Sequence, residues 1–175
     1  MKTMIELIII LIVLLIIITI LSYKIIINKF NIYNIKINKS KKNLVKDLNT
    51  KFELTLKILD FLHNKITIDE DEINEFLNID LKQIEMEELN NILIKTDKFI
   101  DKHLLNNEKL INNEDFVNLN KPIKELNIKI SAIRKYYNDT IKEYNLLINK
   151  FPSKIIAKLK KYNEKDKLKE YKVIH

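Results

Sequence analysis

The sequence contains no Gly, no Cys and no Trp, and only two Pro among 175 residues. Without Gly it lacks the phosphate-cradling loops, nucleophile elbows and dinucleotide-binding turns that need a position which Gly tolerates well. Without Cys it lacks disulfides, thiolate catalysis and the usual structural zinc sites. The scarcity of turn-forming residues favours long helices. We therefore expect a helical protein that is not an enzyme and that binds no cofactor and no metal.

The net charge is +7, and Arg134 is the only Arg among the basic residues. Lys, Ile and Asn are all overused, and because they share AT-rich codons, base composition explains much of the basicity. The charge is nevertheless unevenly distributed: residues 1–67 carry +7, residues 68–120 carry −9 and residues 121–175 carry +9. Codon bias does not account for the acidic middle of the chain.

An uncharged run of 17 residues extends from Leu7 to Tyr23, between Glu6 and Lys24. A helix of this length covers about 26 Å, close to the ~30 Å hydrocarbon core of a bilayer. The run is followed by neither the small-residue cleavage site of a signal peptide nor a lipoprotein Cys. The sequence predicts an uncleaved transmembrane helix over residues 7–27.

The charges that flank this run predict its orientation. Lys2 precedes the run, whereas seven lysines follow it before the first acid, Asp47: Lys24, Lys29, Lys36, Lys39, Lys41, Lys42 and Lys46. The positive-inside rule then predicts a single-pass protein of the cell (inner) membrane, with residues 1–6 outside and a cytoplasmic helical bundle over residues 28–162. Lys24 and Lys29 are candidate contacts of anionic lipid headgroups, whereas most later lysines lie beyond a Debye length of about 8–10 Å.

After the run, apolar residues recur three and four positions apart, which is the spacing of helices that pack together and of coiled coils. Residues 45–66 and 69–105 show this pattern, with an interruption expected near Asn78–Asp80. Residues 30–38 partly alternate like a strand but have no partner strand, so we favour helix. Thr67–Glu70 is a plausible capping box, and Asp69–Glu72 suit the positive end of a helix. The sequence predicts an all-α fold, an antiparallel four-helix bundle.

The clearest stripe lies in residues 123–151. Its members are Ile123, Leu126, Ile130, Ile133, Tyr137, Thr140, Tyr144, Leu147 and Phe151. The helix either begins near Pro122 or begins near Asn113 and contains Pro122, and it must end near Lys150, before Pro152. A short amphipathic helix is expected over residues 155–162, followed by a Lys-rich flexible tail over residues 163–175.

The C-terminal half carries a series of motifs: NEDF at 113–116, AIRKYYND at 132–139, YN at 144–145, FP at 151–152 and Ala157. In their order they resemble the LemA family, whose members show an N-E-x-F start, an A-R-R-x-Y-N-D-A-V-x-x-Y-N core and an F-P-x-x-x-x-A ending. The resemblance is specific over residues 113–157, with one Ile inserted after Ala132. It implies a single-pass membrane protein with a cytoplasmic helical bundle and no established enzymatic activity. The positions that match the motifs are Arg134, Tyr137, Asn138, Tyr144, Asn145, Phe151 and Pro152.

Two interpretations apply to the pairs Tyr137–Asn138 and Tyr144–Asn145, which lie seven residues apart. In the first, the rings fill the core while the hydroxyl and amide groups bond to neighbouring elements or to water. In the second, the pairs form a polar face for a partner. We favour core packing, because such a stripe is more often core than site.

Other titratable groups form no recognisable site. The i,i+3 pair of Asp60 and His63 is far from a di-iron set, and Asp69–Glu72 lack the Gly turn and the bidentate Glu of an EF-hand. His103 is expected at a helix surface and His175 lies in the tail. The basic segment Lys150–Lys172 contains no Arg and so lacks bidentate contacts to phosphate or guanine, and we do not expect nucleic acid as a partner. A solvated tail is favoured there over contact with the membrane surface.

The sequence therefore favours a membrane-tethered, LemA-like helical bundle that acts through protein–protein contacts, as a scaffold or membrane-organising element. Its expected partners are membrane lipids, an unknown protein and, through self-association, a second copy. The alternative is a lipid-surface protein that shapes or stiffens the bilayer through its Lys-rich ends.

Overall fold

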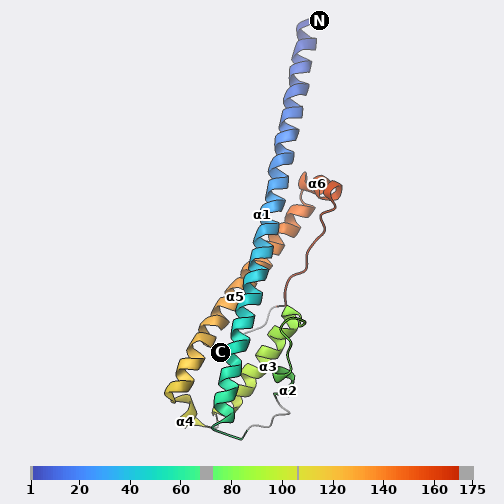
Figure 1. The fold of residues 1–175 in the computed structure, drawn as a ribbon. Helices are drawn as coiled ribbons and strands as arrows, with labels where there is room; N and C mark the ends of the chain where they lie inside the picture. Colours follow the sequence, from blue (N-terminus) through green and yellow to red (C-terminus); the bar gives the residue numbers. More distant parts are fainter. Residues whose placement is uncertain (1, 68–72, 106, 170–175) are drawn as a thin grey trace. The chain divides into compact units, whose positions relative to one another are not determined.

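The computed structural model describes residues 2–67, 73–105 and 107–169. Within these ranges the chain forms helices and no strand, so the all-α prediction is confirmed (Figure 1). The helices are α1 (Lys2–His63), α2 (Asn74–Leu77), α3 (Met86–Leu105), α4 (Glu108–Ile111), α5 (Glu114–Asn149) and α6 (Ser153–Lys160).

Helix α1 combines the predicted membrane helix with the stripe that begins at Val45, as far as Leu62, whereas Ile66 lies beyond its end. No Gly or Pro occurs within it, so nothing in the sequence interrupts the i→i−4 hydrogen bonds. Residues 30–38 are helical, as favoured over a strand. The helix ends at His63, where the Asn64 main-chain N–H and side-chain amide both donate to the carbonyl of Asp60, at 3.1 and 2.8 Å. The predicted capping box and acidic cluster begin at Thr67, and from residue 68 to residue 72 they lie outside the described residues.

The described chain divides into two compact units. The first unit comprises residues 2–39 and 137–167, and the second comprises residues 40–136 together with residues 168 and 169. Both α1 and α5 contribute residues to each unit.

The second unit contains the larger apolar core. Its most buried side chains come from α1, α2, α3 and α5: Leu44, Leu48, Ile58, Leu62, Phe76, Leu89, Leu93 and Phe116. The helix predicted from residue 69 is interrupted by a loop over residues 78–85, as the sequence indicated near Asn78–Asp80. In this loop the Asp80 carboxylate accepts the main-chain N–H of Lys82 at 2.9 Å, a turn that suits a helix break.

The first unit is built from the N-terminal part of α1, the C-terminal part of α5, and α6. Its buried apolar and aromatic side chains are Ile26, Phe30, Ile37, Tyr137, Ile141, Tyr144, Ile148, Ile156 and Ala157. The apolar residues that precede them in α1 are exposed, from Met4 to Leu21. This unit thus consists of a packed part and an N-terminal stretch of α1 whose apolar side chains are exposed.

Helix α5 begins earlier than Pro122 and contains it, so the second of the two predicted starts is the observed one. The Asn113 side-chain oxygen accepts the main-chain N–H groups of Asp115 and Phe116, at 2.9 and 3.3 Å, and thereby caps the helix. The helix ends at Asn149, before Pro152, as predicted. The stripe of residues 123–147 is buried or half-buried throughout.

Phe151 departs from this pattern, and its assignment to the packed stripe is wrong. Its side chain is 77% exposed because the helix has already ended and the chain turns at residues 151–152, so the helical spacing no longer applies. Helix α6 follows at Ser153–Lys160, close to the short helix predicted over residues 155–162. It ends at Lys161, which adopts the left-handed conformation (φ 55°) while the Tyr162 N–H donates to the Ala157 carbonyl.

Candidate functional site

Arg134, a motif residue, lies in the second unit and is only 7% exposed. One guanidinium nitrogen donates to the Glu87 carboxylate at 3.0 Å and to the main-chain carbonyl of Lys169 at 2.7 Å. A planar guanidinium can serve several acceptors at once, which a lysine ammonium on a flexible stem does less well. The contact ties α5 to the first turn of α3 and to the segment after α6.

Tyr144 and Asn145 lie in the first unit and meet different neighbours. The Tyr144 ring, 2% exposed, packs edge-on against Phe30 of α1 with ring centroids 5.6 Å apart. The Asn145 amide donates to the Lys165 carbonyl at 2.9 Å and accepts the Lys165 N–H at 3.0 Å. Burial of its hydroxyl raises the pKa of Tyr144, and the nearby Tyr162 adds to that effect.

The remaining predicted positions divide between core and surface. Tyr137 and Asn138 are 8% and 5% exposed, while Phe151 and Pro152 lie on the surface. Core packing requires buried rings at Tyr137 and Tyr144, and both are buried. Lys24 and Lys29, the candidate headgroup contacts, are exposed on α1.

Two ion pairs that were not predicted from the sequence lie in the second unit. The Lys51 ammonium contacts the Asp97 carboxylate at 2.6 Å, and the Lys129 ammonium contacts the Asp47 carboxylate at 2.8 Å. Burial raises the pKa of Asp97 and outweighs the opposing attraction of Lys51, while Asp101 adds repulsion. The available sequence signal was the i,i+4 series Asp47, Lys51 and Thr55, polar residues that line one face of α1 beside the apolar stripe.

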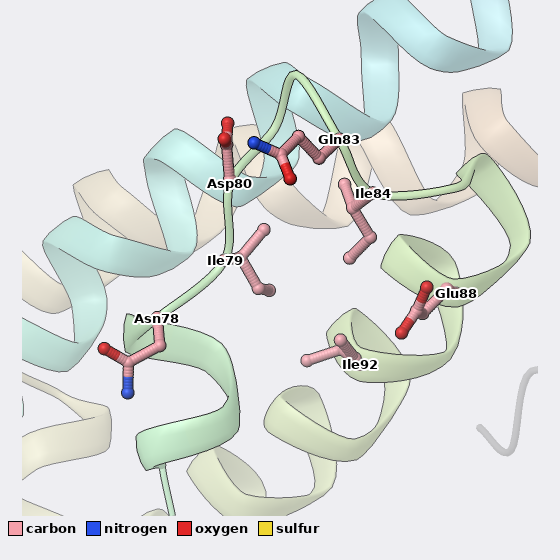
Figure 2. A pocket seen from close by; sticks show the side chains of 7 residues that line it. All are labelled: Asn78, Ile79, Asp80, Gln83, Ile84, Glu88 and Ile92. Carbon is pink, nitrogen blue, oxygen red and sulfur yellow. The ribbon is translucent and has the colours of Figure 1, made fainter.

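A solvent-open hollow of about 290 Å³ lies in the second unit between the loop of residues 78–85 and α3 (Figure 2). Ile79, Ile84 and Ile92 point into it, and Ile92 is buried. Four exposed polar residues border the same space: Asn78, Asp80, Gln83 and Glu88. The hollow has an apolar floor, toward which the Glu88 carboxylate points, while the Asp80 carboxylate lies at its edge and points away from the isoleucines. It was not predicted, because the path of the loop is not encoded in any periodic pattern.

Within the described residues, His63 and His103 belong to no group of three or more ligand-type side chains. His103 packs on Phe99 with ring centroids 4.2 Å apart, and its Nδ1 lies 2.9 Å from the Phe99 carbonyl. It is half-buried rather than fully at the helix surface, while His63 is exposed. Across the part of the chain that the structure describes, no group of three or more His, Asp or Glu side chains could hold a metal ion.

The LemA family model matches residues 85–173, more than half of the chain. The chain belongs to the LemA family. No curated protein and no solved structure matches it. The LemA match extends on both sides of the motif segment 113–157, and it includes both ends of the Arg134–Glu87 contact and of the Asn145–Lys165 contact.

Helix α1 precedes the LemA match and contains one candidate membrane span among the described residues. Its most apolar 18-residue window has a mean hydropathy of 3.4, and none of that window is buried. A core helix of a soluble protein would bury such residues. The exposed apolar helix and the LemA match together fit a membrane-anchored LemA-like protein.

Proposed function

We propose that this LemA-family chain is a non-enzymatic, single-pass membrane protein whose cytoplasmic helices bind a partner protein, as a scaffold or membrane-organising element. The observation that carries the proposal is the hollow beside α3, a preformed concave surface with an apolar floor and an acidic edge. Membrane anchoring by α1 is the second component, and it is supported by the bare apolar run from Leu7 to Tyr23.

The chemistry of the hollow indicates the kind of partner. Isoleucine side chains at the floor favour an apolar group, while the Glu88 carboxylate beside them, with Asp80 at the edge, favours a cation. A lysine or arginine side chain satisfies both, because its methylene stem packs on apolar surface while its charged end meets a carboxylate. We therefore propose a partner segment that presents a basic side chain next to an apolar one.

The proposed absence of enzymatic activity is supported by the engagement of the motif residues. The Arg134 guanidinium and the Asn145 amide bond to groups of the chain itself, and Tyr144 packs against Phe30. These contacts support a structural role for Arg134, Tyr144 and Asn145, which is to hold helices and the C-terminal segment together. The orientation is proposed from the lysines that follow the span, which favour a cytoplasmic C-terminal part.

In-cell photo-crosslinking tests the proposal at residue level. A photoreactive amino acid in place of Gln83, at the edge of the hollow, should give one dominant adduct. The adduct should be lost when Asp80→Asn and Glu88→Gln are added, because these changes remove the charge at nearly constant size. The matched control adds Glu114→Gln and Asp115→Asn, exposed acids in the first turn of α5.

Three outcomes would count against the proposal. They are the absence of an adduct, an adduct that persists without the two charges, and equal labelling from an exposed position on α5 such as Ile128. An adduct with the mass of two chains would identify the partner as a second copy.

A further inference from the structure

Helix α6 and the residues that flank it expose apolar side chains at regular spacing. Phe151, Ile155 and Leu159 are 77%, 54% and 74% exposed and lie four residues apart. A lysine immediately precedes each of them: Lys150, Lys154 and Lys158. A fourth lysine, Lys161, follows Leu159 by two residues. All four lysines are exposed. The segment from residue 150 to residue 163 contains no acid.

The opposite face of α6 is packed within the first unit. Ser153, Ile156 and Ala157 are 4%, 8% and 2% exposed. Because this face is occupied, the helix cannot rotate to bury Ile155 and Leu159 without exposing the others. The fold therefore holds an apolar strip, bordered by lysines, on the outside of this unit.

The first unit also contains the candidate membrane span. A contact between aromatic rings shows which part of α1 lies beside α6. The Tyr162 ring, two residues after α6, lies 4.6 Å from the Phe30 ring, centroid to centroid. Phe30 follows the end of the predicted transmembrane helix, residue 27, by three residues, or about 4.5 Å along a helix. Ile26, three residues after Tyr23, is already buried. Figure 1 shows α6 beside this part of α1.

A headgroup layer begins where the transmembrane helix leaves the hydrocarbon core, and it extends about 5–8 Å on each side of that core. Side chains of phenylalanine and leucine size at this depth reach the boundary between headgroups and acyl chains. Lysines beside them extend their ammonium groups toward lipid phosphates while their stems stay in apolar surroundings.

We propose that the outward face of α6, formed by Phe151, Ile155 and Leu159, inserts into the surface of the bilayer that α1 spans. Lys150, Lys154, Lys158 and Lys161 contact the phosphates of its anionic headgroups. This inference rests on the membrane anchoring in the proposed function. It adds a second point of membrane contact, so that the first unit is held against the bilayer on both α1 and α6.

The charge of this face disfavours a second copy as its occupant. In a symmetric pair the same patch meets itself, which would bring the lysines of two copies together. A bilayer with anionic lipids offers an apolar layer to the exposed apolar side chains of α6 and negatively charged phosphates to the lysines beside them.

The absence of natural Trp gives a direct test with the full chain in lipid nanodiscs. The probe is Phe151→Trp, with Leu159→Trp as a second variant in case the first perturbs the turn. Both emissions should shift to the blue and should be quenched when the phospholipids carry bromine on the acyl chains near the headgroups. The matched control is Ile128→Trp in the second unit, where the natural side chain is 73% exposed and lies outside the strip of α6. The emission of this variant should stay water-like and unquenched.

A third position separates failure of the inference from failure of the anchoring. Leu15→Trp lies in the middle of the apolar run and should be quenched by bromine placed deep in the acyl chains. Quenching at Leu15 without quenching at Phe151 and Leu159 would overturn the inference and leave the anchoring intact. No quenching at Leu15 would overturn both. A blue shift at Phe151 that no brominated lipid quenches would indicate a protein occupant and would also overturn the inference.

The lysines are tested in the Phe151→Trp background by changing Lys150, Lys154, Lys158 and Lys161 to Gln. The natural set should show stronger quenching in anionic than in zwitterionic nanodiscs, and added salt should reduce the difference. The Gln set should lose that difference, whereas Gln at four exposed lysines of the second unit, Lys109, Lys121, Lys124 and Lys135, should keep it. If the two Gln sets showed the same difference in quenching between anionic and zwitterionic nanodiscs, the proposed contact between these lysines and the headgroups would be wrong.

Discussion

Arg134 joins residues that are far apart in the sequence, because Glu87 lies 47 positions before it and Lys169 lies 35 positions after it. Its side chain is 8% exposed and that of Glu87 is 29% exposed. A charge-assisted hydrogen bond in such a setting contributes about 1.5–3 kcal/mol, and a buried charge left without its partner costs more. At this scale the motif arginine acts as a link between segments.

Arg134→Gln is therefore expected to lower the free energy of unfolding by about 2 kcal/mol, because Glu87 and the Lys169 carbonyl lose a charged donor. Urea titration of the full chain in detergent measures this change. Lys135→Gln, on the exposed neighbour, is the control and should stay within about 0.5 kcal/mol. Equal effects of the two variants would show that the Arg134 contacts contribute little.

Asp97 gives a prediction with a defined pH dependence. Burial raises its pKa in spite of the Lys51 ammonium 2.6 Å away, so the folded chain holds this proton more tightly than the unfolded chain. Its contribution to stability is then fully present below the ordinary Asp pKa of about 3.9 and is lost as the pH rises through the raised value. The free energy of unfolding of the natural chain should accordingly fall, relative to that of Asp97→Asn, across this window.

Unfolding of both chains at a series of pH values measures the difference, with Asp139→Asn, an exposed aspartate of α5, as the control. A difference that increases with pH would have the opposite sign. It would mean that attraction by Lys51 outweighs burial and that the pKa of Asp97 is lowered.

At the scale of elements, the segment that follows α6 is held by main-chain contacts. Asn145 both donates to and accepts from the main chain of Lys165, and the Leu168 side chain packs on the core of the second unit. The sequence predicted a flexible tail over residues 163–175 because this end of the chain is rich in lysine and terminal segments are often poorly ordered. Residues 163–169 are not helical, but they make specific contacts as far as Lys169, and residues 170–175 lie outside the described residues.

Asn145→Ala should leave α5 helical, because Ala favours helix. It should also loosen the segment after α6, because it removes both hydrogen bonds to the main chain of Lys165. Amide hydrogen exchange at Lys165, followed by mass spectrometry of the full chain in detergent, should accelerate by roughly tenfold, which corresponds to a loss of about 1.4 kcal/mol. Asn118→Ala on the exposed side of α5 is the control and should leave the exchange unchanged. Unchanged exchange in Asn145→Ala would show that other contacts hold the segment.

The helices were predictable from the sequence because their signals are local. The apolar run of α1, the stripe of α5 and the end of α5 before Pro152 each depend on residues within a few turns of one another. The sequence did not predict that Phe151 is exposed. Phe151 continues the three-and-four spacing of the stripe, but the helix ends two residues before it, at Asn149.

The candidate site was less predictable, because it depends on loops and on distant pairs. The burial of Tyr137 and Tyr144 followed from their place in the stripe. The ion-pair partners of Arg134 and Lys51 could not be predicted in this way, because an ion pair between two helices does not affect the spacing of residues within either helix. The hollow beside α3 depends on the turn at Asp80, which the sequence only marked as an interruption.

At the scale of the whole molecule, the proposed topology rests on seven lysines between the apolar run and Asp47, against Lys2 before it. The chain contains no Cys, so single cysteines report their side of the membrane without background. In cells treated with a maleimide that does not cross membranes, Lys2→Cys should be labelled directly, and Lys109→Cys, an exposed position in α4, only after permeabilisation.

Reversed labelling would contradict the positive-inside assignment, and labelling of both positions in intact cells would contradict a single stable orientation. Reversal would place the hollow beside α3, the proposed binding surface, outside the cytoplasm and so remove the proposed cytoplasmic scaffold. It would not by itself move α6 away from the headgroups, because α6 follows α1 to whichever side the lysines face, as the Phe30–Tyr162 contact requires. The topology experiment and the Trp quenching experiment therefore test different claims: the first tests which leaflet the helices face, and the second tests whether α6 touches it.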